Sequence, residues 1–105
     1  MGKINNRRNV RVDCQAVAKA EGPRGPIRGV CRNISIGGMF FRGPRLPVGS
    51  SAELTIDLPS GTIRAVGEVR YHHAYGDGEG MGIRFSRLSQ EDLAAVTRFV
   101  EAAGK

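Results

Sequence analysis

The sequence predicts one small, mostly β domain that ends in a single helix. Through residue 86, apolar side chains alternate with polar ones in about six short segments separated by Gly- and Pro-rich turns, which is the pattern of half-buried strands. After that residue the apolar spacing becomes that of an amphipathic helix. Short strands with glycine-rich turns favour an antiparallel barrel or a sandwich. A chain of 105 residues supports one compact domain, residues 1–105.

The first half of the chain is predicted to contain three strands. In the first, the apolar positions that alternate with polar ones are Val10, Val12, Cys14, Ala16 and Ala18. Two prolines and two glycines in EGPRGP, residues 21–26, predict a turn. Residues 27–36 and 38–42 are predicted to be two further strands, hinged at the Gly-Gly pair between them. The segment GPRLPVGS, residues 43–50, is predicted to be a loop.

The second half begins with the clearest strand pattern of the sequence. Its alternating apolar positions are Ala52, Leu54, Ile56 and Leu58. A turn at PSG, residues 59–61, leads into a longer strand that runs to about Tyr71. The segment YGDGEG, residues 75–80, is predicted to be a hairpin loop. The apolar positions of the last strand are Met81, Ile83 and Phe85.

The C-terminal segment 89–103 is predicted to be an amphipathic helix. Ser89 can cap its N-terminus, with Asp92 three residues later as in a capping box. Leu88 and Leu93 can form a hydrophobic staple across that cap. The apolar stripe consists of Leu93, Val96, Phe99, Val100 and Ala103. Such a helix needs an apolar surface, and we expect it on an open end or side of the barrel.

The charge of the chain is unevenly distributed. The net charge is +6, and residues 1–50 hold ten Lys and Arg against two acidic residues, whereas residues 51–105 hold six against eight. Thirteen of the sixteen basic residues are Arg, whose planar guanidinium pairs bidentately with phosphate or a guanine edge and stacks on rings. A basic half of this kind indicates an anionic partner. The alternative is a solvated basic face that keeps the protein soluble.

Several classes of protein are not indicated by this sequence. No apolar run approaches the ~20 residues of a membrane span, and MGKINNRR lacks the apolar core of a signal peptide, so we expect a cytoplasmic protein without a membrane partner. Reduced thiols are then expected for Cys14 and Cys31. The two cysteines and the pair His72 and His73 lack zinc-ligand spacing, so no metal site is predicted. No carboxylate pair or nucleophile–base set is arranged for catalysis, which predicts that the protein is not an enzyme.

Two groups of polar residues are candidates for binding an anionic ligand. The first is NRRNVRV, in which Arg7 and Arg11 are four residues apart with Arg8 between them. Two guanidinium groups on one short segment can close on a purine, pair with its edge and reach its phosphate. The alternative is that residues 1–8 are a frayed, flexible basic tail.

The second group lies in CRNISIGGMFF. Asn33 and Ser35 have the same parity on a strand, so both are expected to emerge on one face while Ile34 and Ile36 point inward. An amide can bond a base edge and a hydroxyl can donate to a phosphate oxygen. Gly38 permits a positive φ or the close approach of a ligand, although an ordinary polar turn with a glycine bulge explains the same residues. Because sequential strands are usually neighbours, the two groups are expected to form one site suited to a guanine nucleotide.

These residues resemble the ligand-binding motifs of the PilZ domain family, whose members are bacterial receptors for cyclic di-GMP. The family motifs Arg-x-x-x-Arg and Asp/Asn-x-Ser-x-x-Gly are matched by Arg7 and Arg11 and by Asn33, Ser35 and Gly38. VGEVRY and GMGIRF are similar to two family strands, and LSQEDLAAVTRFVEAA is similar to its terminal helix. The resemblance covers nearly the whole chain in the family's order. It implies a six-stranded antiparallel β-barrel with one C-terminal amphipathic α-helix.

The resemblance also implies a set of ligand-binding residues. They are Arg7, Arg8, Arg11, Asn33, Ser35, Gly38 and Tyr71. The arginines would stack on guanine and pair with base or phosphate. Asn33 would bond a guanine edge, Ser35 would contact phosphate, and Gly38 would allow close approach. Tyr71 stands where the family frequently has Trp, whose larger face stacks better.

The sequence therefore predicts a receptor for cyclic di-GMP that needs no cofactor. Its Arg-rich N-terminal segment would fold over the barrel when the ligand neutralises it, and this would alter a surface for a downstream protein. One alternative is a basic barrel that binds RNA or single-stranded DNA, but such surfaces usually carry more stacking aromatics than four Phe and two Tyr provide. The other alternative is a PilZ-like adaptor that binds protein and no nucleotide.

Overall fold

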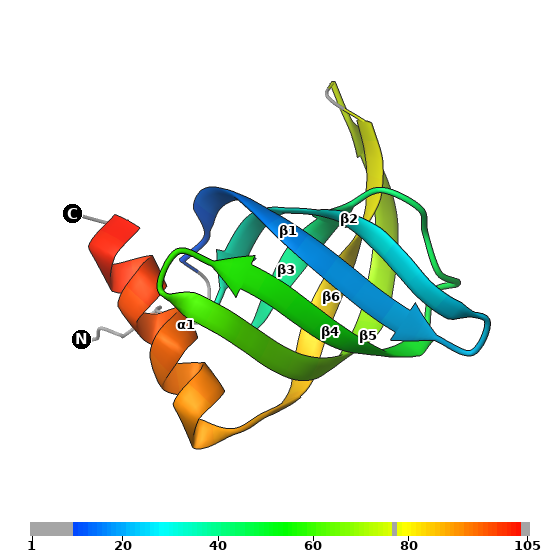
Figure 1. The fold of residues 1–105 in the computed structure, drawn as a ribbon. Coiled ribbons are helices and arrows are strands. Elements are labelled where there is room, and N and C mark those ends of the chain that lie inside the picture. Colours follow the sequence, from blue (N-terminus) through cyan, green and yellow to red (C-terminus); the bar gives the residue numbers. More distant parts are fainter. Residues whose placement is uncertain (1–9, 77, 104–105) are drawn as a thin grey trace, which may run out of the picture.

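In the computed structural model, which describes residues 10–76 and 78–103, six antiparallel strands close into a barrel and one helix lies at an end of it (Figure 1). Around the barrel the strands follow the order β1-β2-β3-β6-β5-β4. The elements are β1 (Val12–Gly22), β2 (Gly25–Ser35), β3 (Gly38–Arg42), β4 (Ser51–Leu58), β5 (Gly61–Tyr75), β6 (Gly78–Leu88) and α1 (Gln90–Ala103). The predicted fold class is confirmed. Of the two architectures that the strand pattern favours, a barrel and a sandwich, the chain forms the barrel.

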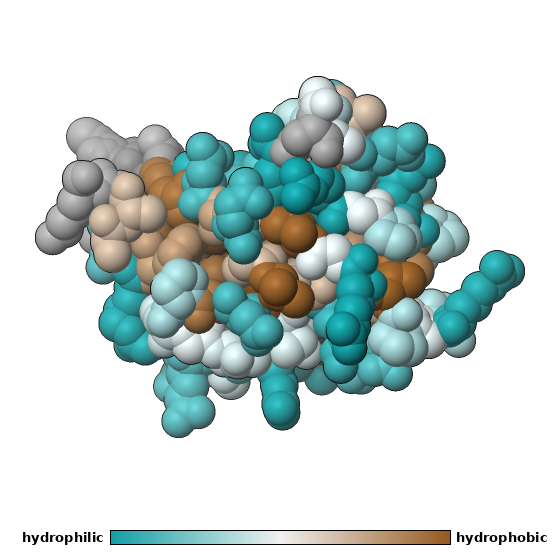
Figure 2. All heavy atoms as spheres, turned by 45° about the horizontal axis from the view of Figure 1, so that its top comes forward, coloured by the Kyte–Doolittle hydropathy of each residue, from teal (hydrophilic) through white to brown (hydrophobic). Residues whose placement is uncertain are grey.

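Aliphatic side chains fill the interior of the barrel. The alternation in β4 shows this most simply, because its four apolar side chains are at most 5% exposed: Ala52, Leu54, Ile56 and Leu58. Burying side chains of the size of Leu or Ile stabilises the fold by about 1.5–3 kcal/mol each. On the face shown in Figure 2, apolar side chains also gather in several places among polar ones. Because side chains occupy the interior, a ligand site is expected on the outer wall.

The hairpin between β1 and β2 is tighter than the sequence predicts. β1 continues to Gly22, which pairs with Gly25 in β2, so the predicted turn at residues 21–26 contracts to Pro23 and Arg24. The φ of Gly25 is 106°, a conformation that residues with a side chain rarely adopt. Proline and glycine thus mark the tip of the hairpin, while the residues beside them still pair.

The hairpin between β5 and β6 also has a shorter loop than the sequence predicts. β5 runs to Tyr75, past the predicted end at about Tyr71, and β6 begins at Gly78, so the hairpin predicted at residues 75–80 is present but its loop is shorter than predicted. Alternate glycines of β6 pair with aromatic residues of β5: Gly78 with Tyr75, Gly80 with His73 and Gly82 with Tyr71. Aromatic side chains beside bare backbone allow strands to pair where the glycine content suggests a loop.

Helix α1 begins as predicted. The amide of Asp92 donates to Ser89 Oγ (3.0 Å), and Ser89 Oγ donates to Asp92 Oδ2 (2.7 Å), so Ser89 caps a helix that starts one residue after it. The helix contacts β2, β5 and β6. Among the described residues, no helix is long and apolar enough to cross a membrane.

The predicted apolar stripe of α1 is only partly correct. Val96 and Val100 are buried, but Leu93 is 41% exposed and Ala103 is also exposed. The helix covers an end of the barrel, so its buried strip is narrow, and Leu93 falls at the rim of that contact. The first strand is shifted in a similar way, because it starts two residues after Val10, which is 42% exposed.

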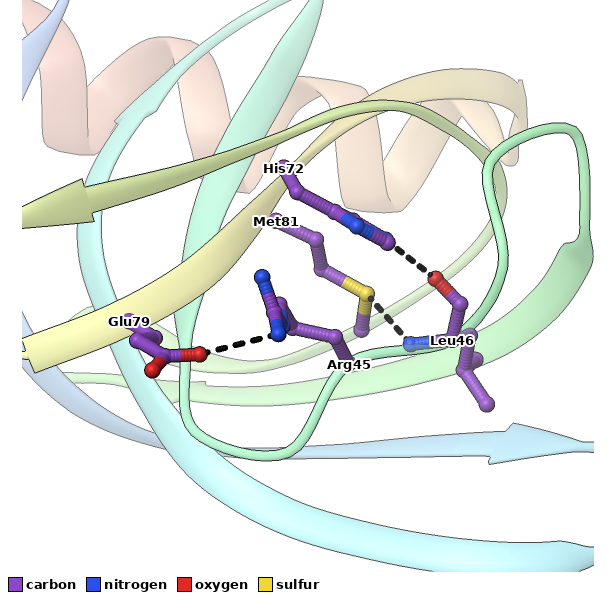
Figure 3. A network of polar contacts seen from close by, with 5 residues as sticks. All are labelled: Arg45, Leu46, His72, Glu79 and Met81. Atoms are coloured by element: carbon purple, nitrogen blue, oxygen red, sulfur yellow. Dashed lines mark hydrogen bonds and ion pairs between the residues drawn. The ribbon is translucent and has the colours of Figure 1, made fainter.

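The loop between β3 and β4 is fastened to the β5–β6 hairpin (Figure 3). Arg45 forms an ion pair with Glu79 (3.0 Å), and the amide of Leu46 donates to Met81 Sδ (3.3 Å). His72 Nε2 donates to the carbonyl oxygen of Leu46 (2.7 Å). The Leu46 side chain is itself buried. These contacts give His72, for which the sequence suggests no role, a structural one.

Candidate ligand-binding site

Arg11 and Asn33 come together at one edge of the barrel. Arg11 lies just before β1, and its Nη1 donates to Asn33 Oδ1 on β2 at 2.8 Å. The pairing of Asp13 with Asn33 brings the start of β1 beside this part of β2, as expected for sequential strands. Arg7 and Arg8, the other arginines of the predicted clamp, lie outside the described residues.

Asn33 and Ser35 are less accessible than the sequence predicts. Both were expected on an exposed face, but Asn33 is 8% and Ser35 only 1% exposed. A register shift between Cys31 and Asn33 marks an irregularity in the pairing of β2 with β3, so simple alternation no longer describes this segment. Ile34 is buried as predicted, whereas Ile36 is only half-buried.

Ser35 also has a local structural role. Its Oγ accepts a hydrogen bond from the amide of Gly37 (3.1 Å), which stabilises the turn between β2 and β3. A hydroxyl that accepts one hydrogen bond still has its own O–H to donate. Ser35 can therefore hold the turn and contact an anion at the same time.

A hollow of about 260 Å³ lies against these residues on the outer wall. Its lining residues are Arg11, Ser35, Gly37, Arg70, Tyr71, Gly82, Ile83 and Arg84. They come from the segment just before β1, from the end of β2 and the turn that follows it, and from β5 and β6, so segments far apart in the sequence meet here. Two predicted site residues besides Arg11 line it, namely Ser35 and Tyr71. Asn33 reaches this site through its bond to Arg11.

Arg70 and Arg84 also line the hollow, although no motif in the sequence points to them. Arg70 Nη1 lies 3.6 Å from Glu68 Oε1 in a half-exposed ion pair. Solvent screens most of the attraction between these two charges. Arg84 is exposed and forms no ion pair with any residue of segments 10–76 and 78–103. With Arg11 they place three guanidinium groups around one hollow. Only the strand register brings them together, since Arg84 pairs with both Gly38 and Glu68.

Tyr71 is held in place from two sides. A Cβ built on Gly82 would collide with the Tyr71 ring, so the ring lies directly over this glycine. Phe40 lies behind it, with ring centroids 6.5 Å apart, and Phe40 also contacts Tyr75 edge-on at 4.7 Å. Tyr71 remains 43% exposed. An aromatic ring that is fixed by its neighbours and still partly exposed is suited to stack on a flat ligand.

Gly38 is required by the fold. Neither it nor Gly37 has a positive φ, contrary to one of the reasons given for a glycine at position 38. A Cβ at Gly38 would collide with the carbonyl oxygen of Ile83 on β6. The bare backbone therefore allows β3 and β6 to approach each other and sets Arg84 opposite Gly38. Gly37, not Gly38, lines the hollow.

The chemistry of the hollow suits the binding of an anion. Its polar groups are guanidinium donors, a serine hydroxyl and a tyrosine ring, which suit a flat ligand that carries negative charge. No acid–base pair lines it. Among the described residues, no group of three His, Cys, Asp or Glu is placed to hold a metal ion.

The chain matches one protein family along nearly its whole length. The model of the PilZ domain matches residues 5–102. None of the curated proteins matches the chain. Nothing in the comparisons indicates an enzyme family.

Solved structures with the same fold include three that bear on the site. The inhibitor of motility MotI/DgrA of Bacillus subtilis superimposes with a TM-score of 0.81 at 24% identity, covering 97% of this chain and 53% of its own. YcgR of Escherichia coli in complex with c-di-GMP gives 0.76 at 14% identity, covering 88% of this chain and 43% of its own. The PilZ domain of YcgR with c-di-GMP gives 0.70 at 12%, with 90% and 88% covered. The chain thus spans about half the length of the first two proteins.

Proposed function

Because this chain belongs to the PilZ domain family, we propose that it is a non-catalytic receptor for cyclic di-GMP. The observation that carries the proposal is the convergence of Arg11, Arg70 and Arg84 with Tyr71 around one outer hollow. Cyclic di-GMP offers two phosphates to guanidinium groups and two flat guanines to a ring. Two structures of YcgR, which has the same fold, contain this ligand, and that supports the same class of ligand here.

The described residues support a division of roles. Arg11, whose guanidinium is oriented by the amide oxygen of Asn33, stacks on or pairs with a guanine. Arg84, which has no ion pair among the described residues, meets a phosphate. Tyr71 stacks on the base, and the Ser35 hydroxyl donates to a phosphate oxygen.

We infer that binding also engages the segment that precedes Arg11. Arg7 and Arg8 belong to it, and a ligand with two phosphates attracts both cations toward the hollow. Closing this segment over the ligand changes the surface that a downstream protein meets, which is how a binding domain without catalytic groups signals.

The test is an isothermal titration of the whole chain with cyclic di-GMP, with GTP and a short single-stranded RNA in parallel. We expect saturable binding of cyclic di-GMP, and a loss of about 10- to 150-fold in affinity for Arg84→Gln, because a hydrogen bond to a charged group contributes roughly 1.5–3 kcal/mol. Arg98→Gln removes the same charge from the exposed side of α1 and serves as the matched control.

Each alternative has its own outcome in this experiment. Binding of RNA without binding of the dinucleotide would identify a nucleic-acid barrel, although the buried positions of Phe40 and Phe41 leave few aromatic rings for stacking on bases. If the chain binds neither RNA nor cyclic di-GMP, the remaining alternative is an adaptor that binds protein and no nucleotide. Equal losses of affinity for Arg84→Gln and Arg98→Gln would show that the ligand does not bind in the hollow.

A further inference from the structure

The two cysteines of the chain lie against each other inside the barrel. Cys14 Sγ and Cys31 Sγ are 3.0 Å apart, and the Cys14 thiol also donates to the carbonyl oxygen of Cys31 (2.9 Å). Both are free thiols, and Cys14 is 8% exposed while Cys31 is fully buried. Nothing in the ligand-binding role requires this thiol pair, Cys14 and Cys31.

A local irregularity of the strands produces the contact. In the pairing of β1 with β2 the register shifts between Asp13 and Ala16, and Ala16 pairs with Cys31. Cys14 lies within the shifted segment, and both cysteines belong to the buried core. An irregular strand places side chains where regular pairing does not, and here it places one sulfur beside another.

We propose that the thiol pair is an oxidation site at which a small peroxide converts the two thiols to an intramolecular disulfide. A disulfide needs its sulfurs about 2.05 Å apart, so the sulfurs have to close by roughly 1 Å from their present separation. Such a shift is on the scale of side-chain adjustment. A peroxide is the class of oxidant that suits the site, because burial restricts access to small molecules.

The reaction proceeds in two balanced steps. The Cys14 thiolate attacks one oxygen of hydrogen peroxide, the O–O bond breaks, hydroxide leaves, and Cys14 becomes a sulfenic acid. Cys31 then attacks the Cys14 sulfur, the S–O bond breaks, and water leaves with the thiol proton. In total two thiols lose two electrons and two protons, and one peroxide is reduced to two waters.

The surroundings assign Cys14 to the first step. Cys14 is the more exposed of the two, and its side-chain hydrogen bond with the Cys31 sulfur lowers the pKa of the Cys14 thiol. The same hydrogen bond, together with burial, raises the pKa of the Cys31 thiol. The thiolate is the reactive form, so Cys14 is the thiol that meets the oxidant and Cys31 the one that resolves the intermediate.

The disulfide would fasten β1 to β2 beside the ligand site. Cys14 lies three residues after Arg11, and Cys31 lies two residues before Asn33 on the neighbouring strand. Closing the loop between positions 14 and 31 restricts the unfolded chain, so the oxidised protein is expected to melt several degrees higher than the reduced one. Amide exchange in β1 and β2 is expected to slow as well.

The experiment exposes the reduced, folded protein to hydrogen peroxide, then denatures it, alkylates it with N-ethylmaleimide and measures its intact mass. We expect a product about 2 Da lighter that takes no alkyl group, and two alkyl groups after reduction with dithiothreitol. Cys31→Ser is expected to accumulate a sulfenic acid at Cys14 that dimedone traps. Cys14→Ser is expected to keep Cys31 reduced. Thermal melts of both variants establish that they fold.

A comparison with the unfolded chain makes the wild-type result decisive without any variant. If the fold brings the sulfurs together, Cys31 captures the sulfenic acid at Cys14 faster in the folded protein than in urea, so the ratio of disulfide to dimedone-trapped sulfenic acid is expected to be at least about tenfold higher in the folded protein, because positioning replaces a diffusive search. An equal or lower ratio in the folded state would mean that the core only shields two inert thiols. Products heavier by about 32 Da, which are sulfinic acids, would likewise overturn the proposal.

Discussion

Arg11 and Asn33 are joined by a 2.8 Å hydrogen bond between a guanidinium nitrogen and an amide oxygen, although they lie far apart in the sequence. The bond fixes the direction of a long, rotatable side chain at the mouth of the hollow. Asn33 is 8% exposed and its oxygen is engaged by Arg11. We infer that it acts on a ligand mainly by orienting Arg11, rather than by the independent base contact that the sequence suggests.

This relationship predicts a non-additive pair of substitutions. Arg11→Lys keeps the charge but loses the planar fork, and Asn33→Ala loses the partner that orients it. Each is expected to weaken cyclic di-GMP binding by roughly 1–3 kcal/mol, and the double variant to be hardly worse than either single one, because both remove one shared unit. A calorimetric double-mutant cycle measures this. Fully additive losses would show that the two residues contact the ligand separately.

Ser35→Ala is expected to lower both affinity and stability. The substitution leaves the partly buried amide of Gly37 without its acceptor, at a cost of about 1–3 kcal/mol in the free energy of unfolding. Ser86→Ala is the control, since Ser86 Oγ donates to a carbonyl oxygen at an exposed position, where we expect a change within about 0.5 kcal/mol. Urea titrations of both variants decide the matter. Equal urea midpoints for the two variants would show that Ser35 does not stabilise the turn.

Substitutions at Tyr71 and at Gly82 are expected to have different effects on affinity and stability. Tyr71→Ala removes a partly exposed ring and should weaken ligand binding by roughly 1–3 kcal/mol while changing the melting temperature little. Gly82→Ala forces the ring from its place, so affinity and stability should fall together. Gly76→Ala, which meets open space at an ordinary φ, is the neutral control. Wild-type affinity in Gly82→Ala would show that the position of the ring does not matter to the ligand.

The cap of α1 offers a test that is independent of any ligand. Ser89→Ala removes the acceptor for the amide of Asp92 and should cost about 1 kcal/mol in the free energy of unfolding. Thr97→Ala, in the same helix, removes a hydroxyl that donates back to the carbonyl of Leu93, and should be neutral or stabilising. Chemical unfolding followed by circular dichroism compares them. The reverse order would mean that the cap contributes nothing.

The alternation of apolar residues was enough to predict the strands and the helix, because each inward position of a strand such as β4 has to be apolar. It failed where composition and pairing disagree. Glycines of β6 predict a loop in the sequence, because the aromatic residues with which they pair lie on another strand. The length of the buried strip on α1 could not be predicted either, because it depends on how the helix meets the end of the barrel.

Sequence motifs point to part of the candidate site and not to the rest of it. Arg11, Asn33 and Ser35 belong to short motifs that can be recognised in the sequence, and the structure brings them to one edge. Arg70 and Arg84 belong to no such motif, and they reach the hollow only through the register of β5 with β6 and of β3 with β6. Register is a property of strand pairs, so a single sequence does not reveal it.

The filled interior of the barrel has a consequence for redesigning this protein. Side chains that hold the strands together point inward, whereas Arg70, Tyr71 and Arg84 stand on the outer wall. A library that varies these three positions can therefore search for other anionic ligands without disturbing the core. Ser35 is the exception, because it lines the hollow and also holds a turn. New specificities should be selected with that residue kept constant.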